Sequence, residues 1–353
     1  MQAKTFRAPR NLSLSTISAD SIQPSRRSHY VQAAVVHQWG GPEQLVLETV
    51  ADPTPSPDHT VVELKASAVN WHDILVRRSG RGFPLPRILG IDGAGIRRDT
   101  GEEVLIYPGL NWGDNPAAPS AQFSILGDDT DGTYAELVCV PAANLFPKPR
   151  HLGWEEAAAL PVGALTAYRA IVTRAGLRPG DTVLVLGAGS GVSTFSIMIA
   201  ATLGATVLVT SSSTDKIERV RELGATDGVL YTDPNWPRQI IDATGGVDVV
   251  VDGVGANLDQ SLSCLKPGGR VVVFGATAGT VGNIDIPSLY FGQHTILGST
   301  LGTRDEFGRM LSLFDAHRLR PVIDSLRPLT DVRAAHERIE SRAHFGKLVL
   351  SID

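Results

Sequence analysis

The pattern of apolar and polar positions divides the chain into two halves. From Val31 to about Val140, short β-branched runs such as 60–64 and 103–107 alternate with turns rich in Gly, Pro and Asp. Runs of this length between turn residues are typical of strands. Residues 109–133 follow neither the strand period nor the helix period, so we expect a long excursion there. The first half is therefore predicted to be a β-rich domain.

The second half alternates apolar strands with helices. Helical segments at 155–159 and 166–175 are separated by an interruption at 161–163. The continuous apolar run at 182–186 is typical of a parallel strand covered on both faces. Further strands are expected at 206–210, 247–251 and 270–274, with helices from 191 to 201 and from 215 to 223. This alternation predicts an α/β fold with a doubly wound parallel sheet.

The length of 353 residues exceeds what one hydrophobic core usually serves. We expect a catalytic domain at 31–155, a cofactor-binding domain at 156–299, and a segment at 300–353 whose last strand, 347–350, returns to the first domain. Residues 1–30 form an extension rich in Ser and Arg, with Asp20 as its first acid. This composition is that of a transit peptide, and a disordered tail or an upstream start codon are the other interpretations.

The composition narrows the possible partners. A formal net charge of -5 predicts no nucleic-acid partner, and no apolar run approaches the roughly 20 residues that a membrane span needs. Cys139 and Cys264 lie far apart and outside any metal-ligand spacing, which favours a reducing compartment. The predicted location is cytoplasmic, or an organelle if the extension is a transit peptide.

The clearest chemical motif is a glycine-rich turn between the strand at 182–186 and the next helix. Glycines allow the backbone to approach a pyrophosphate, whose charge the helix N-terminus then holds. A strict dinucleotide fingerprint would have its third glycine at Val192, one place after Gly191. The predicted pyrophosphate-binding residues are Gly187, Gly189, Ser190, Gly191, Val192 and Ser193.

The end of the second strand distinguishes NADP from NAD. An acid there would bind the ribose 2′-hydroxyl of NAD, but Ser211 and Ser212 stand at this place and Lys216 follows. Hydroxyls and an ammonium group favour the 2′-phosphate of NADPH. In the alternative interpretation, Ser213 only caps the next helix and Lys216 is solvated.

Several segments in order resemble the medium-chain dehydrogenase/reductase superfamily, which includes zinc alcohol dehydrogenases and quinone reductases. The matching segments are 68–73, 89–95, 157–161 with 165–168, and the glycine-rich turn, in which Ser193 is a departure. The resemblance covers Val31 to Asp353 and implies a GroES-like catalytic domain followed by a Rossmann domain. It also implies that Thr166 lies near the nicotinamide, Tyr231 near the adenosine phosphate and Gly275 with Ala276 beside the nicotinamide ribose, and that the protein is a homo-oligomer.

The differences from the zinc enzymes of this superfamily concern the metal ligands. The positions that correspond to the catalytic zinc ligands resemble Asn70, Ile91 and Val162, and two of these side chains cannot bind a metal. The excursion at 108–132 resembles the structural-zinc lobe but contains no cysteine. We expect no zinc, with a residual cation cluster of His72, Asp73 and Asp92 as the alternative.

Without a metal to stabilise charge, hydride transfer from NADPH suits an acceptor that delocalises its own charge, such as a quinone or an α,β-unsaturated carbonyl. Asn70 is the predicted donor to the substrate oxygen, His72 the predicted proton donor and Thr166 the residue beside the nicotinamide. Residues 74–78 contain none of the tyrosines that related enoyl-thioester reductases carry.

The substrate is expected to be a small hydrophobic carbonyl compound or quinone. The aromatic residues Trp71, Trp112, Tyr290 and Phe291 are the predicted pocket walls, although core packing would explain them equally. Two other functions stay open: a zinc-type alcohol dehydrogenase with an atypical metal site, and a nucleotide-binding redox sensor without catalysis.

Overall fold

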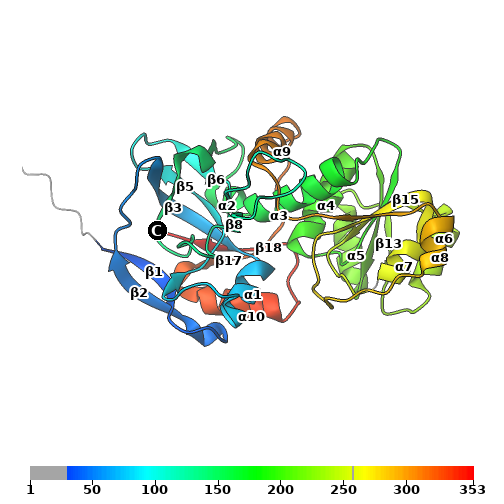
Figure 1. The fold of residues 1–353 in the computed structure, drawn as a ribbon, viewed down its shortest axis with the longest axis horizontal. Coiled ribbons are helices and arrows are strands. Elements are labelled where there is room, and N and C mark those ends of the chain that lie inside the picture. The colour runs from blue at the N-terminus through cyan, green and yellow to red at the C-terminus, as the bar shows by residue number, and fades with distance from the viewer. Residues whose placement is uncertain (1–29, 257) are drawn as a thin grey trace, which may run out of the picture.

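The computed structural model describes residues 30–256 and 258–353, which form two regions of different architecture (Figure 1). The strands of the early and the last parts of the chain lie at the left of the view, and a parallel sheet lies at the right. The predicted extension at 1–30 falls outside the described residues except for Tyr30, so its three interpretations stay predictions. No helix in the described ranges is both long enough and apolar enough to cross a membrane.

The parallel sheet has six strands in the order β13-β12-β11-β14-β15-β16, and every neighbouring pair is parallel. This is the strand order of a doubly wound dinucleotide-binding fold, so the predicted fold class is confirmed. Its inner strands are aliphatic because helices cover both faces, as the apolar runs indicated. The strands are β11 (Thr182–Val185), β12 (Thr206–Ser211), β13 (Asp227–Leu230), β14 (Val247–Asp252), β15 (Leu265–Val273) and β16 (Thr295–Gly298).

Helices connect these strands and continue beyond them. A difference from the sequence-based expectation occurs just before the sheet, where α3 begins at Pro161 itself and passes into a π-helix at Arg169–Arg174. Proline suits a first helical position because no hydrogen bond from its nitrogen is needed there. The helices of this region are α3 (Pro161–Tyr168), α4 (Gly191–Thr202), α5 (Thr214–Arg221), α6 (Trp236–Thr244), α7 (Leu258–Ser263), α8 (Ile286–Phe291) and α9 (Arg304–Ala316).

The other region is built on antiparallel strands, apart from the parallel pair of β17 and β18. Its largest sheet has the order β10-β6-β5-β3-β18-β17, with β9 also paired to β3, and a second sheet has the order β2-β1-β4. The strands are β1 (Tyr30–Val36), β2 (Leu45–Ala51), β3 (His59–Val69), β4 (Arg87–Ile88), β5 (Asp92–Arg97), β6 (Glu103–Ile106), β9 (Leu137–Pro141), β10 (Leu145–Pro147), β17 (Ile323–Pro328) and β18 (Lys347–Ser351). Three helices accompany them: α1 (Trp71–Ser79), α2 (Trp154–Ala158) and α10 (Val332–Glu340).

Two features of this region position the candidate site. The last strand, β18, pairs antiparallel with β3, so the end of the chain lies beside the strand that leads into α1. The expected excursion contains only the short strands β7 (Gly109–Leu110) and β8 (Ser124–Ile125) as strand structure, and these pair with each other. The last strand thereby reaches the start of α1, since Leu348 pairs with Val69.

Candidate active site

The glycine-rich turn lies where β11 ends and α4 begins. Gly187 and Gly189 have φ values of +72° and +101°, which favour glycine because a Cβ atom strains the backbone there. Ser190 caps α4, since its Oγ accepts a hydrogen bond of 3.2 Å from the backbone nitrogen of Ser193. Ser193, the departure from the family pattern, is buried and donates through Oγ to the Leu186 carbonyl at 3.0 Å. The turn is thus a preformed cradle at a helix N-terminus.

The residues predicted for the adenosine phosphate lie at the next strand end. Ser211 is buried at the end of β12, and its carbonyl accepts a hydrogen bond of 2.9 Å from the backbone nitrogen of Tyr231, so these two residues are neighbours. Ser212 is exposed, and the Tyr231 ring is half-exposed. Lys216 is not simply solvated: its Nζ donates to the carbonyls of Arg342 at 3.2 Å and His344 at 2.9 Å. Burial lowers the pKa of Lys216.

The segment 342–346 crosses the glycine-rich turn, and the sequence analysis did not single it out. The backbone nitrogen of Gly346 donates to the Gly189 carbonyl at 2.8 Å. Arg342 donates through Nη2 to the Thr277 carbonyl at 2.9 Å, and the Arg219 guanidinium stacks on the Phe345 ring at 3.7 Å. Thr277 directly follows Gly275 and Ala276, the residues expected beside the nicotinamide ribose. The segment therefore connects both ends of the predicted cofactor crevice.

Gly275 and Ala276 follow β15, and Thr166 lies on α3. A Cβ atom on Gly275 would come within 2.8 Å of the Gly253 carbonyl oxygen, so the loops after β14 and β15 approach closely. Thr166 is buried, and α3 packs against α4 through Gly163, where a Cβ atom would meet the Phe195 ring at 2.8 Å. These contacts put Thr166 on a helix that packs against α4, which follows the glycine-rich turn, and Gly275 beside the loop after β14, the strand next to β11.

The amide of Asn70 belongs to a buried cluster with Asp92 and Lys347. Lys347 Nζ donates to Asn70 Oδ1 at 2.6 Å and to Asp92 Oδ2 at 2.8 Å, and Asn70 Nδ2 donates to the same Asp92 oxygen at 2.9 Å. The side chains of Lys347 and Asp92 are only 3% and 0% exposed. The other carboxylate oxygen, Asp92 Oδ1, accepts a hydrogen bond from the Val162 backbone nitrogen at 2.7 Å. The cluster is thus a buried ion pair of Lys347 and Asp92 that also bonds to two neutral groups, the Asn70 amide and the Val162 backbone.

Lys347 joins this cluster to the glycine-rich turn. A Cβ atom on Gly191 would lie 2.9 Å from Lys347 Cδ, so the lysine stem runs against the first residue of α4. The sequence analysis treated Lys347 only as the first residue of a returning strand. A charged residue at the start of an otherwise apolar strand was the one available signal for it.

His72 lies next to the cluster at the start of α1 and points to the excursion. Its Nε2 lies 2.8 Å from Asp128 Oδ1, and the two side chains are 23% and 8% exposed. Asp128 was not among the predicted site residues. No local pattern marks it, because 56 residues separate it from His72.

A second buried chain of polar groups begins at Asp73. Its Oδ2 accepts a hydrogen bond of 2.8 Å from the Asn70 backbone nitrogen, and Tyr134 hydrogen-bonds to the same carboxyl group. The Tyr134 hydroxyl lies 3.1 Å from His336 Nε2. Burial raises the pKa of Asp73 to about 7 and lowers the pKa of His336 to about 3. Burial thus favours the uncharged form of both groups.

Of the predicted pocket walls, only Trp71 lies beside the cluster, immediately before His72. Trp112 is buried against Phe123 in an edge-to-face contact, and the rings of Tyr290 and Phe291 are exposed on α8. Core packing thus accounts for Trp112. The aromatic residues do not gather around one site.

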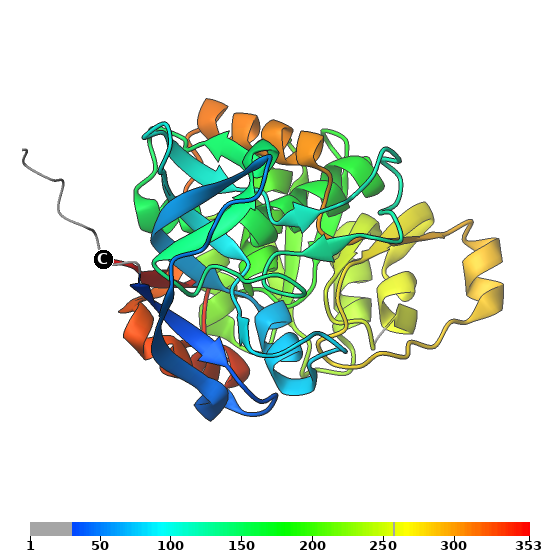
Figure 2. The same cartoon turned by 60° about the vertical axis from the view of Figure 1, so that its left-hand side comes forward.

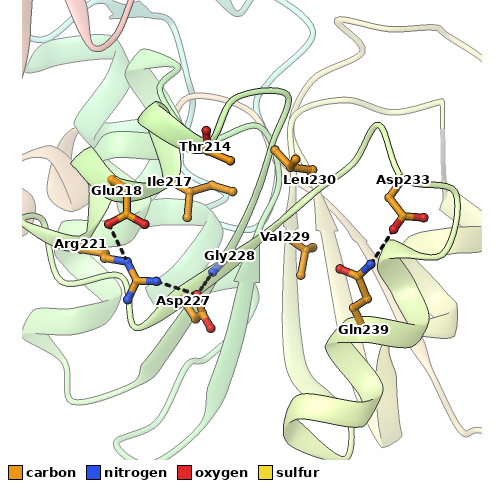
Figure 3. Close-up of a pocket in the computed structure, with 10 residues that line it drawn as sticks. All are labelled: Thr214, Ile217, Glu218, Arg221, Asp227, Gly228, Val229, Leu230, Asp233 and Gln239. Atoms are coloured by element: carbon orange, nitrogen blue, oxygen red, sulfur yellow. Dashed lines mark hydrogen bonds and ion pairs between the residues drawn. The ribbon is translucent and has the colours of Figure 1, made fainter.

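A shallow pocket elsewhere contains none of the predicted site residues (Figure 3). It lies along the outer strand β13, between α5 and α6. Glu218 and Asp227 both pair with Arg221, and Asp233 accepts a hydrogen bond from Gln239 at 2.7 Å. Its polar groups already bind one another.

Comparisons with known proteins agree with this architecture. Residues 56–150 match the alcohol dehydrogenase GroES-like domain, and residues 191–316 match the zinc-binding dehydrogenase family. The chain is 34% identical over 342 residues to a zinc-type alcohol dehydrogenase-like protein of Schizosaccharomyces pombe, an alignment that covers 90% of this chain and 99% of that protein. The chain belongs to the medium-chain dehydrogenase/reductase superfamily. It is an oxidoreductase of this superfamily, whose members bind NAD(P).

Other relatives in the superfamily have different names. Human quinone oxidoreductase is 30% identical over 333 residues, which cover 91% of this chain and 97% of that protein. The crystal structure of an NAD-dependent alcohol dehydrogenase superposes with a TM-score of 0.87 at 38% identity and covers 91% of this chain and 100% of that chain. The predicted family and fold are confirmed, whereas the names of these relatives state different substrates, an alcohol or a quinone, and only the name of the crystal structure states a cofactor, NAD.

The residues at the superfamily's zinc positions do not fit zinc. Ile91 and Val162 offer no donor side chain, and both oxygens of Asp92 already accept hydrogen bonds. His72 and Asp73 bind Asp128 and Asn70, respectively, so the three residues of the alternative cation cluster face different partners. Within residues 30–256 and 258–353, no group of three or more His, Cys, Asp or Glu side chains is arranged to hold a metal. A nicotinamide dinucleotide does fit, because the glycine cradle faces a helix N-terminus.

Proposed function

We propose that this protein is a zinc-independent reductase that transfers hydride from NADPH to a quinone or an α,β-unsaturated carbonyl compound. The observation that carries the proposal is the buried Asn70 amide, held between a lysine and a carboxylate beside the glycine-rich turn. Such an amide is a fixed, polarised hydrogen-bond donor. It can stabilise negative charge that develops on the substrate oxygen, as the Lewis acid does in zinc-dependent enzymes.

Lys347 fixes the orientation of the amide. Its ammonium group can only donate, so the Asn70 atom that it contacts at 2.6 Å is the oxygen. One Nδ2 proton is then directed to Asp92 at 2.9 Å, while the other contacts the Ala68 carbonyl at 3.5 Å, a weak interaction. The second proton is therefore available to a substrate oxygen. The Lys347 ammonium group polarises the amide through its oxygen, and this makes the second Nδ2 proton a stronger hydrogen-bond donor.

The remaining residues act around this donor. NADPH, when bound, supplies the hydride, and a conjugated acceptor spreads the resulting negative charge. Asn70 stabilises the acceptor oxygen, His72 gives a proton and Thr166 packs beside the nicotinamide. The glycine-rich turn, Gly187 to Ser193, holds the pyrophosphate, and Gly275 with Ala276 borders the ribose.

Preference for NADPH is proposed from the groups at the end of β12. Ser211 and Ser212 offer hydroxyl groups, Tyr231 lies beside them, and Lys216 now donates to two neutral carbonyls. Exchange of these carbonyls for a phosphate would replace neutral hydrogen bonds by charge-assisted ones, which are about twice as strong. An acidic side chain that would repel the phosphate is absent from positions 210–214.

The test is oxidation of NADPH and of NADH by a quinone and by an enone, on protein whose zinc content is measured. We expect turnover with NADPH without stoichiometric zinc, unchanged by a chelator. Lys216→Met should weaken NADPH binding about tenfold and leave NADH binding unchanged, with Lys266→Met as a control on the same sheet. Bound zinc with alcohol oxidation would instead indicate an alcohol dehydrogenase, and nucleotide binding without turnover a redox sensor. Equal use of both nucleotides would contradict the cofactor proposal.

We also propose a homodimer through β16 and α8. Figure 2 shows the segment around α8, yellow to orange in the colour bar, standing clear of the body. Its apolar side chains are exposed, including Ile286, Tyr290 and Phe291. Within the described residues β16 pairs only with β15, and a twofold axis would pair its free edge with that of a second copy. Phe291→Glu should lower the molar mass measured by light scattering, whereas Leu47→Glu on β2 should not.

The cytoplasmic location stays a prediction from the sequence. Cys139 and Cys264 are free thiols, which suits a reducing compartment. Fractionation of cells that express the full chain would test the location and the transit-peptide interpretation together.

A further inference from the structure

The contact between His72 and Asp128 is held in place by the excursion and is not a chance surface pair. Gly127 has a φ of +86°, and a Cβ atom there would lie 2.8 Å from the Gly90 carbonyl oxygen. A Cβ atom on Gly132 would lie 2.1 Å from the same oxygen. Two glycines on either side of Asp128 thus let the excursion pack directly onto the segment between β4 and β5 that leads to Asp92.

Backbone hydrogen bonds fix the same stretch. Leu126 donates to the Pro108 carbonyl at 2.9 Å, Gly132 to the Ile88 carbonyl at 2.8 Å, and Asp128 to the Ile125 carbonyl at 3.0 Å. These hydrogen bonds fix the backbone that carries the Asp128 carboxylate. It is buried, whereas His72 keeps part of its ring at the surface of the site.

The chemistry of this pair determines which nitrogen of His72 is free. A carboxylate only accepts hydrogen bonds, so Nε2 carries the proton that faces Asp128. Within the described ranges, Nδ1 of His72 has no hydrogen-bond partner. The open position for a second proton is therefore Nδ1, on the side of the ring away from Asp128. The pair has the geometry of a proton donor oriented by a carboxylate.

We propose that Asp128 is a positioning residue that holds His72 as the proton donor in the reduction of the carbon–carbon double bond of an α,β-unsaturated carbonyl compound, so that the excursion serves catalysis. This inference deepens the proposed function and rests on it. NADPH, when bound, would supply a hydride to the β-carbon of an enone, and the alkene electron pair would move toward the carbonyl to give an enolate. The Nδ1–H proton of His72 then bonds to the α-carbon, and its electron pair stays on Nδ1. Water restores the proton, while Nε2–H stays on Asp128.

Quinones need this proton much less. Hydride transfer to a quinone gives a hydroquinone anion, whose phenol-like oxygen has a pKa near 10, so the anion can leave and take its proton from water. An enolate must gain a proton at carbon to become the product. Loss of the proton donor should therefore lower turnover of the enone much more than turnover of the quinone. Loss of the fold would lower both.

The experiment compares Asp128→Asn with wild type on an enone and a quinone. We expect the enone kcat to fall about 10- to 100-fold while the quinone kcat stays within about threefold. Asp129→Asn is the matched control: it makes the same change on the next residue, which is exposed and outside the dyad. His72→Gln should give the larger enone defect, and the double variant His72→Gln/Asp128→Asn should be no worse than His72→Gln alone.

Two further readouts separate positioning from a structural role. In D2O, wild type should deuterate the α-carbon of the enone on one face, and His72→Gln on both faces. Nitrogen-15 NMR of histidine-labelled protein should show a proton on Nε2 of His72, identified by the loss of its signal in His72→Gln, and Asp128→Asn should alter that signal without any substrate.

Different results would contradict the role of Asp128 and the proposed function. Equal loss of quinone and enone turnover in Asp128→Asn, or one-face deuteration by His72→Gln, would overturn the positioning role. Absence of turnover by wild type with both acceptors would overturn the proposed function itself, and with it the assignment of His72.

Discussion

The two regions differ in where the partners of their buried carboxylates lie in the sequence. In the parallel sheet, the buried carboxylate of Asp252 accepts hydrogen bonds from the backbone nitrogens of Val254 and Gly255, two and three residues away. In the antiparallel region, Asp92 is paired with Lys347 across 255 residues of sequence. The first arrangement forms as soon as one turn forms. The second exists only when the whole chain has folded, so the candidate site depends on tertiary structure far more than the cofactor cradle does.

The same comparison extends to two lysine–aspartate pairs of nearly equal length. Lys347 to Asp92 measures 2.8 Å and Lys266 to Asp248 measures 2.7 Å, but the second pair is 36% and 26% exposed. Lys347→Met should lower the free energy of unfolding by about 3–5 kcal/mol, because it leaves a buried carboxylate unpaired. Lys266→Met should cost about 1 kcal/mol or less. Urea unfolding measures both.

The double variant Lys347→Met/Asp92→Asn sharpens this test. Since it removes both charges, it should recover most of the stability that Lys347→Met loses. Equal losses in Lys347→Met and Lys266→Met would show that burial does not distinguish the two pairs.

The buried Asp73 gives the antiparallel region a pH dependence. Its pKa is raised from 3.8 to about 7, so between these values the folded state binds more protons than the unfolded state. Stability from this group is complete below pH 4 and is lost as pH rises through 7, at up to about 1.4 kcal/mol per pH unit. His336, with its pKa lowered to about 3, acts in the opposite sense as pH falls from 6.5.

Comparison with Asp73→Asn isolates the aspartate contribution. Unfolding free energies of wild type and this variant should converge or cross as pH rises from 4 to 7 and stay parallel above about pH 8. A difference independent of pH across that interval would mean that Asp73 is ionised in the folded protein.

The smallest expected effect concerns the cofactor cradle. Gly189→Ala places a Cβ atom 3.0 Å from Lys216 Cδ and Phe345 Cδ2, whereas Gly180, with a similar φ of +87°, has no atom within 4 Å of such a Cβ. Both changes should cost about 1 kcal/mol of stability, because alanine resists positive φ. Only Gly189→Ala should weaken NADPH binding, about fivefold, as measured by fluorescence titration. If both variants bind NADPH equally well, Lys216 does not belong to the proposed phosphate site.

Features that depend on neighbouring residues could be predicted from the amino-acid sequence. Aliphatic runs predicted the strands of the parallel sheet, since a strand buried on both faces must be apolar along its length. The glycines at 187 and 189 predicted a tight turn, and the structure gives both a positive φ. The start of α3 was missed by a few residues, because Pro161 was interpreted as an interruption and not as a first helical position.

The partners of the catalytic candidates, by contrast, depend on the folded chain. Asn70 and His72 were predicted from the sequence, but Lys347 and Asp128, which hold them, were not. Lys347 reaches Asn70 because β18 inserts beside β3, and Asp128 reaches His72 because two glycines let the excursion pack against Gly90. Side-chain pairs so distant in sequence leave no periodic signal, since their proximity is a property of the sheet order and of loop packing, which no stretch of neighbouring residues contains.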